Sequence, residues 1–269
     1  MDKQKFIERQ MRLIEAVCGM HRQIWDLDES LKKMYPIAIV KDDIFYIFGR
    51  KGQNCEYEFI MEYPAAMELP AKILAAFPLD FYDDKIAAVI CADEFANPDN
   101  HVFVFHEFVH CYQFENFEQA LKKGLKIYGE EMQKGNFMWE ITHPFPYDDE
   151  VFVALTNELI GTFGEISLEN FVRYHDRLKK HLNIIDFEYM VWQQWKEGYA
   201  RYVENLIRKK LGMKENLNGL SAPFNRVSFY EIGCRHIEAL IKNDPKINRS
   251  IDGLFYAMTR RLKPAKDSD

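Results

Sequence analysis

Residues 101–111 read HVFVFHEFVHC, and this stretch decides how the chain is interpreted. Apolar side chains fill most of its positions, which predicts a buried helix that we expect to span residues 101–123. Two histidines, His106 and His110, stand four residues apart, and Glu107 follows the first of them. Residues i and i+4 lie on one face of a helix, so both imidazoles can reach one metal ion.

The chemistry of an HExxH pair on a helix points to zinc. Zn²⁺ accepts imidazole nitrogen, and in catalytic sites it takes three protein ligands and one water molecule. Glu107 projects beside such a site, where it can take a proton from the zinc-bound water, whose pKa the metal lowers towards about 7. Burying these polar groups without partners is costly. The competing interpretation is a helix that carries two hydrogen-bonded core histidines.

The segments before this helix predict a mixed α and β region. A buried strand at 86–93, IAAVICAD, leads into it, and a short helix is expected from Pro70 to Phe77. Further towards the N-terminus, residues 37–63 contain three β-rich runs with glycines in the turns, and residues 2–34 follow a helical apolar stripe.

The segments after the helix predict mostly helical structure. Residues 124–149 look irregular, and a capping-box pattern at Ser228 and Glu231 predicts a helix from 228 to 242. The other expected helices span residues 150–163, 168–182, 187–211 and 250–262. The prediction is an α+β fold in a single domain, residues 1–269, with an N-terminal α/β part over 1–100 and a helical part over 101–269.

Composition narrows the classes of partner. The net charge is −7, and the basic clusters at 208–210 and 260–261 stand at expected helix ends, so nucleic acid is not an expected partner. No segment approaches the ~20 apolar residues of a membrane span, and residues 1–12 lack a signal-peptide pattern. The five cysteines are widely spaced without a CxxC pair. We therefore expect buried free thiols and a cytoplasmic protein, with no membrane partner.

The HExxH motif alone does not identify the third metal ligand. The pattern HExxHxxGxxH fails, because Gln113 and Asn116 occupy its glycine and histidine positions. The peptide deformylase arrangement fails too, since no EGC segment precedes the motif. A downstream glutamate is the remaining common choice, and Glu158 and Glu197 both lie in apolar helical segments.

Residues 197–200, Glu-Gly-Tyr-Ala, combined with the HExxH motif, resemble the gluzincin peptidases, especially their aminopeptidase-like group. In that group an EG-aromatic-A helix supplies a zinc-binding glutamate. The resemblance implies a zincin-like fold, a Zn²⁺ cofactor and Glu197 as the metal ligand beside His106 and His110. It favours Glu197 over Glu158.

A third motif follows in the same order. Tyr230-Glu231-Ile232-Gly233 resembles the YxxG segment of gluzincins, whose tyrosine hydroxyl stabilises the oxyanion. The resemblance covers residues 106–233, about half of the chain, and implies catalytic roles for Glu107 and Tyr230. A tyrosine packed in the core is the alternative for Tyr230. The chain departs from the aminopeptidases in the long segment 111–196, and its 65–69 segment, with Glu68, is only a weak match to their GxMEN motif.

Two further residues, one expected function and three alternatives to it complete the hypotheses from the sequence. Glu204, seven residues after Glu197, is either an acceptor for a ligand histidine or a solvated residue, and His236 is a weaker candidate for the site. The expected function is that of a zinc metallopeptidase acting on a peptide or protein. The alternatives are a zinc-stabilised binding domain without catalysis, a hydrolase of non-peptide amides or esters, and a helical interaction protein without metal.

Overall fold

Five strands form one mixed sheet in the order β3-β2-β1-β5-β4 in the computed structural model, which describes residues 2–52, 55–66, 69–247 and 250–259. The strands are β1 Ile37–Lys41, β2 Ile44–Arg50, β3 Tyr57–Pro64, β4 Leu74–Leu79 and β5 Lys85–Cys91. β1 and β5 pair in parallel, and the other pairs are antiparallel. Nearly every residue of these two central strands is buried, which explains their continuous apolar sequences.

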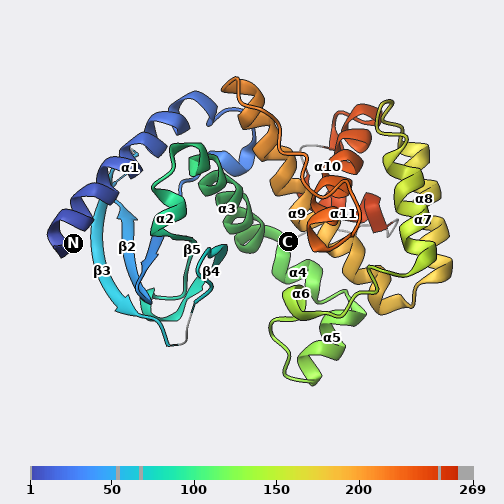
Figure 1. The fold of residues 1–269 in the computed structure, drawn as a ribbon, viewed down its shortest axis with the longest axis horizontal. Coiled ribbons are helices and arrows are strands. Elements are labelled where there is room, and N and C mark those ends of the chain that lie inside the picture. Colours follow the sequence, from blue (N-terminus) through green and yellow to red (C-terminus); the bar gives the residue numbers. More distant parts are fainter. Residues whose placement is uncertain (1, 53–54, 67–68, 248–249, 260–269) are drawn as a thin grey trace, which may run out of the picture. The chain divides into compact units, whose positions relative to one another are not determined.

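Two long helices pack on the sheet. Helix α1, Lys3–Ile24, lies along β3, and helix α3, His101–Gln113, packs on β4 and β5 (Figure 1). The helix expected over residues 2–34 therefore ends at Ile24. Short elements make the remaining connections: η1 Glu29–Leu31, η2 Asp80–Tyr82, α2 Ala92–Phe95 and η3 Pro98–Asn100. As predicted, the helix with the HExxH motif follows the buried strand β5 closely.

The helix predicted from Pro70 to Phe77 is wrong. Residues Leu74–Leu79 form β4 instead, which pairs with residues 85–90 of β5. Alanine and leucine favour helices locally, but the free edge of β5 offers hydrogen bonds and a packing surface. Strand preference depends on such surroundings more than on the residues themselves.

The prediction of five free thiols is also wrong. Cys18 of α1 and Cys55, just before β3, form a disulfide with their Cα atoms 5.6 Å apart. They are 37 residues apart in sequence, but the packing of α1 on β3 brings them together. Cys91, Cys111 and Cys234 are free and buried. A disulfide is typical of oxidising compartments, so cysteine usage no longer supports a cytoplasmic location.

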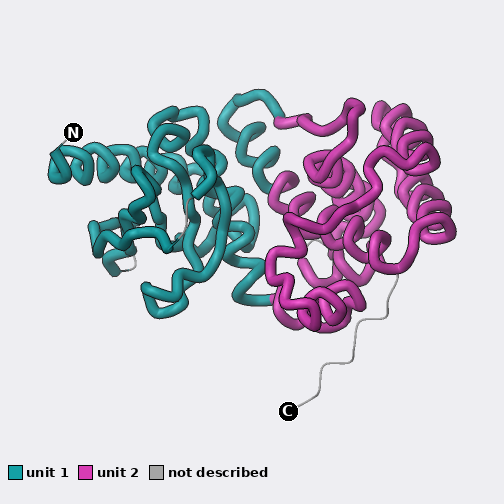
Figure 2. Tube along the Cα trace, turned by 60° about the horizontal axis from the view of Figure 1, so that its bottom comes forward, with its two compact units in different colours: residues 1–116, 203–215 teal, residues 117–202, 216–269 magenta. Residues whose placement is uncertain are grey.

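The chain divides into two compact units, which Figure 2 colours separately. Unit 1 comprises residues 1–116 and 203–215, and unit 2 comprises residues 117–202 and 216–269. The helix α9, Ile184–Lys210, contributes residues to both. The single domain expected from the sequence stays a prediction.

All regular secondary structure in the described part of unit 2 is helical. After a π-helical stretch at Phe114–Glu118, the helices are α4 Gln119–Lys122, α5 Lys126–Gln133, α6 Trp139–Thr142, α7 Glu150–Ile160, α8 Leu168–His181, most of α9, α10 Arg226–Asn243 and α11 Ile251–Thr259. The segment expected to be irregular thus contains two short helices, α5 and α6. The α+β class with a mostly helical C-terminal part is confirmed.

The start of α10 differs from the prediction. Asn225 is the N-cap, and its side chain accepts a hydrogen bond from the backbone N–H of Val227. Ser228 completes the capping box as the N3 residue, so α10 begins two residues before the predicted start. Among the described helices, none is long and apolar enough to cross a membrane.

A buried ionic cluster joins α4, α6 and α9 within unit 2. Lys196 Nζ lies 2.7 Å from Glu140 Oε2 and 3.3 Å from Glu118 Oε1, and Lys122 pairs with the same two glutamates. Burial opposes the charge of Glu140, but Lys196 and Lys122 outweigh it and lower its pKa from 4.5 to about 2. The cluster fixes the turn of α9 that comes directly before Glu197.

We expect Glu140→Gln to destabilise the protein by about 3–5 kcal/mol at neutral pH, because it leaves buried lysines without their partner. Glu140 has a lowered folded-state pKa, so its charge stabilises the fold fully above pH 4.5 and progressively less as the pH falls towards 2. Denaturant unfolding of both proteins across this pH range should therefore show that the difference between their free energies of unfolding becomes smaller as the pH falls. Glu130→Gln, which breaks an exposed pair with Lys126, is the control and should change stability by less than about 1 kcal/mol. A pH-independent difference would contradict this account.

Candidate metal centre

Helix α3 carries buried polar groups within an apolar helix. Its side chains are buried except at Phe103 and Tyr112. His106, Glu107 and His110 are therefore held in fixed positions by the packing of this helix on β4 and β5. Such a site on a packed helix holds its geometry better than a site on a loop.

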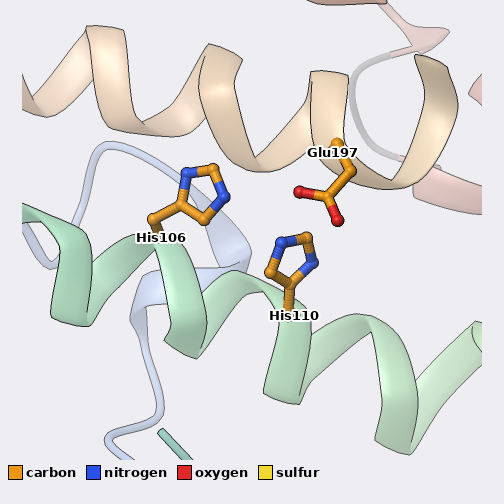
Figure 3. A group of neighbouring side chains, drawn as sticks. All are labelled: His106, His110 and Glu197. Atoms are coloured by element: carbon orange, nitrogen blue, oxygen red, sulfur yellow. The ribbon is translucent and has the colours of Figure 1, made fainter. Parts of the chain in front are cut away.

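His106, His110 and Glu197 come together (Figure 3). Each offers one ligand atom, and these atoms all lie within 4.8 Å of one another. All three residues are buried. These are the three metal ligands expected from the sequence, with Glu197 on α9 and both histidines on one face of α3. Two imidazole nitrogens and one carboxylate oxygen form a donor set that suits zinc and leaves a coordination position for water.

Hydrogen bonds orient both imidazoles for this role. His106 Nδ1 lies 3.0 Å from Glu204 Oε2, and His110 Nδ1 lies 2.9 Å from Gln113 Oε1. A histidine that donates its Nδ1 proton to such an oxygen has no proton on its other ring nitrogen. The lone pair is then on Nε2, as a metal-binding histidine requires.

Glu204 fulfils the acceptor role that the sequence left open. Its side chain is fully buried, and Arg208 Nε donates to its Oε1 at 2.7 Å. The Arg208 guanidinium also covers the ring of Phe103, 5.2 Å from its centroid. The buried carboxylate thus has a histidine on one oxygen and an arginine on the other.

Gln113 is the residue whose role was missed. In the sequence it stands out only as a departure from the HExxHxxGxxH pattern. Its position three residues after His110 is a usable signal, because i and i+3 side chains are neighbours on a helix. An amide oxygen at this position can accept the Nδ1 proton of the second histidine.

Glu107 is buried on α3, one residue after His106. Cys111 lies one turn further along the same helix. Burial raises the pKa of the Cys111 thiol well above its ordinary value, and the charge of Glu107 raises it further. The group of candidate ligands consists of two histidines and a glutamate and does not include Cys111.

Tyr230 is connected to Glu197 through Arg226. It stands one turn into α10 and is half-buried. The guanidinium carbons of Arg226 and Arg201 lie 5.6 Å and 5.7 Å from its ring centroid. Arg226 Nη1 lies 3.8 Å from Glu197 Oε1. Tyr230 is not part of the three-residue ligand group, and its catalytic role stays a prediction.

Two glycines allow α9 and α10 to cross at backbone contact. A Cβ atom on Gly198 would lie 2.6 Å from the backbone of Gly233, and one on Gly233 would collide with the backbone carbonyl of Gln194. These are the glycines of the EGxA and YxxG segments. Their contact brings together the turns that carry Glu197 and Tyr230, which gives a physical reason for glycine at both positions.

The structure separates the weaker candidates from the site. Glu158, the alternative third ligand, is exposed and pairs with Arg177, their charged atoms 2.5 Å apart. His236 is buried in a stack on Phe171, with ring centroids 4.7 Å apart. Glu68 lies outside the described residues.

Comparisons with protein-family models, with curated proteins and with solved structures found no match for the chain.

We expect Gly233→Ala to destabilise the protein by about 1–3 kcal/mol or more, because the added methyl group forces α10 away from the Gln194 carbonyl. Thermal or denaturant unfolding measures the effect. Gly129→Ala in α5 is the matched control, since no atom lies within 4 Å of the added group. It should be neutral or stabilise by up to about 1 kcal/mol. Equal effects of the two substitutions would refute the close crossing.

Proposed function

We propose that this protein is a zinc-dependent hydrolase, a divergent gluzincin-like peptidase with a zincin-like fold. The observation that carries the proposal is the buried group His106, His110 and Glu197, whose ligand atoms lie within 4.8 Å of one another. The Nδ1 hydrogen bonds of both histidines support it, because they present the other ring nitrogen to a metal. The resemblance of the three ordered motifs to gluzincins favours peptide bonds as the substrate.

In the proposed reaction the protein supplies a base, an oxyanion donor and fixed ligands. A bound zinc ion would act as a Lewis acid and lower the pKa of water in the site. Glu107 takes the proton of the attacking water and passes it to the leaving amine. Tyr230 donates its hydroxyl hydrogen to the carbonyl oxygen as negative charge develops there.

Purified protein should contain about one zinc ion per chain. His106→Ala should lose the metal and Glu197→Ala should bind it more weakly, because each removes one ligand. Elemental analysis after dialysis against zinc, followed by competition with a chromogenic chelator, measures stoichiometry and affinity. Glu158→Ala is the matched control for Glu197→Ala and should bind zinc like the parent protein. A parent protein without metal, even when zinc is offered, would refute the proposal.

Glu107→Gln should retain zinc while turnover of a quenched-fluorescence peptide library falls by about 10²–10⁴-fold. The amide keeps the size of the side chain but removes the base. Unchanged turnover in this variant would exclude Glu107 as the base. A parent protein that binds zinc tightly but cleaves no amide or ester would instead support the zinc-stabilised binding domain.

A further inference from the structure

Arg226 occupies an unusual position beside the candidate metal centre. It is the first residue of α10, and its side chain is 34% exposed. Its guanidinium lies 3.8 Å from Glu197 and covers one side of the Tyr230 ring. It therefore contacts a candidate metal ligand and the candidate oxyanion donor at once.

The guanidinium of Arg226 donates no hydrogen bond to any residue that the structure describes. The 3.8 Å pair with Glu197 is too long for one. Other arginines of the helical core are bonded: Arg208 to Glu204, Arg235 to Glu231 and Glu238, and Arg201 to the carbonyl of Asn216. An arginine has five N–H donors, and those of Arg226 are accessible from outside, because its side chain is 34% exposed and none of its nitrogens is among the buried atoms that lack a partner.

The charge of Arg226 is paired with a candidate metal ligand. Glu197 is the acid beside it, and the other groups that act on its charge are the phenols of Tyr230, Tyr189 and Tyr147. Burial raises the pKa of Tyr189 and of Tyr147, so both phenols are neutral at physiological pH. A metal ion held by Glu197 would take up part of the charge of this carboxylate, and the positive charge of Arg226 would then be available to another anion.

We propose that Arg226 binds a carboxylate of the peptide substrate, next to the bond that is cleaved. This inference rests on the proposed function, and it names the substrate class as peptides with an acidic group beside the scissile bond. A guanidinium fits a carboxylate with two parallel hydrogen bonds, and the empty donors of Arg226 supply that geometry. The carboxylate is either the C-terminus of the peptide or an aspartate or glutamate side chain.

A role for Arg226 in holding Glu197 is the rival explanation, and it has a different consequence. A residue that only positions a metal ligand affects zinc affinity, and it does so equally for acidic and neutral peptides. A residue that binds the substrate changes the preference between an acidic peptide and its neutral analogue while zinc stays bound. The two roles are therefore separated by measuring both quantities on the same samples.

The experiment measures peptide binding by calorimetry in zinc-loaded Glu107→Gln protein, in which turnover is blocked. One pair of probes is N-acetyl-Ala-Phe-Ala as the free acid and as its C-terminal amide. The other pair is N-acetyl-Ala-Asp-Ala-amide and the same peptide with Asn in place of Asp. Preference for the free acid identifies the terminal carboxylate, and preference for the Asp peptide identifies a side chain.

We expect the acidic member of one pair to bind about 10–100-fold more tightly than its neutral partner. Arg226→Gln should abolish this preference, and Arg226→Lys should keep part of it. Arg177→Gln, which removes a more exposed arginine from its pair with Glu158, should leave the preference unchanged.

Two results would overturn the inference: no acidic preference in either pair, or a preference that persists in Arg226→Gln. Loss of zinc in Arg226→Gln alone would also overturn it, since Arg226 would then act on Glu197. Absence of zinc from the parent protein is a separate result, which refutes the proposed function itself.

Discussion

The hydrogen bond between His106 and Glu204 is the constraint on which the site depends. Both groups belong to unit 1, and Glu204 is fully buried, so its charge requires the partners that His106 and Arg208 provide. Removing one partner of such a pair leaves a buried charge uncompensated, at a cost of about 3–5 kcal/mol. The pair therefore fixes the register of α9 on α3 strongly. Because α9 is one continuous helix, fixing Glu204 also determines which face of the helix Glu197 occupies, seven residues earlier.

Glycine contact between α9 and α10 is the second constraint. Gly198 follows Glu197 directly, and Gly233 comes three residues after Tyr230. Their backbones touch, so the position of α10 along α9 has little freedom. The long segment 111–196 can then separate the HExxH and EGxA motifs in sequence without changing the positions of their side chains in the site. Loop-closure entropy grows only slowly with length, and residues 117–196 form helices with a buried ionic cluster of their own.

The sequence predicted those features whose signal is local. The apolar runs of β1 and β5 identify buried strands, and the i, i+4 spacing of His106 and His110 places them on one face of a helix. The prediction of Glu197 as the third ligand depended on the resemblance to gluzincins, because no local pattern selects it over Glu158. Glu197 lies on α9 and both histidines lie on α3, so no local pattern can show that their ligand atoms are close.

Features that depend on long-range contacts were predicted wrongly or missed. β4 exists because β5 offers an edge, and Cys18 meets Cys55 because α1 packs on β3. Gln113 appeared only as a mismatch to a motif, although its amide holds His110. The deciding partner of β4 and of Cys18 lies on another element, whereas Gln113 lies only three residues from His110 and was missed because the motif does not specify this hydrogen bond.

The balance of charge around the site connects the metal to the substrate. Glu107, Glu197 and Glu204 are buried carboxylates, and Arg208 and Arg226 are the guanidiniums that pair with them. With neutral histidines, this set carries one negative charge in excess. A bound divalent cation would change the net charge of this set from −1 to +1. The N–H donors of Arg226 lie beside this positive charge. An anionic group on the substrate would then restore neutrality, so the same charges that favour a metal ion in the empty protein favour a carboxylate in the loaded one.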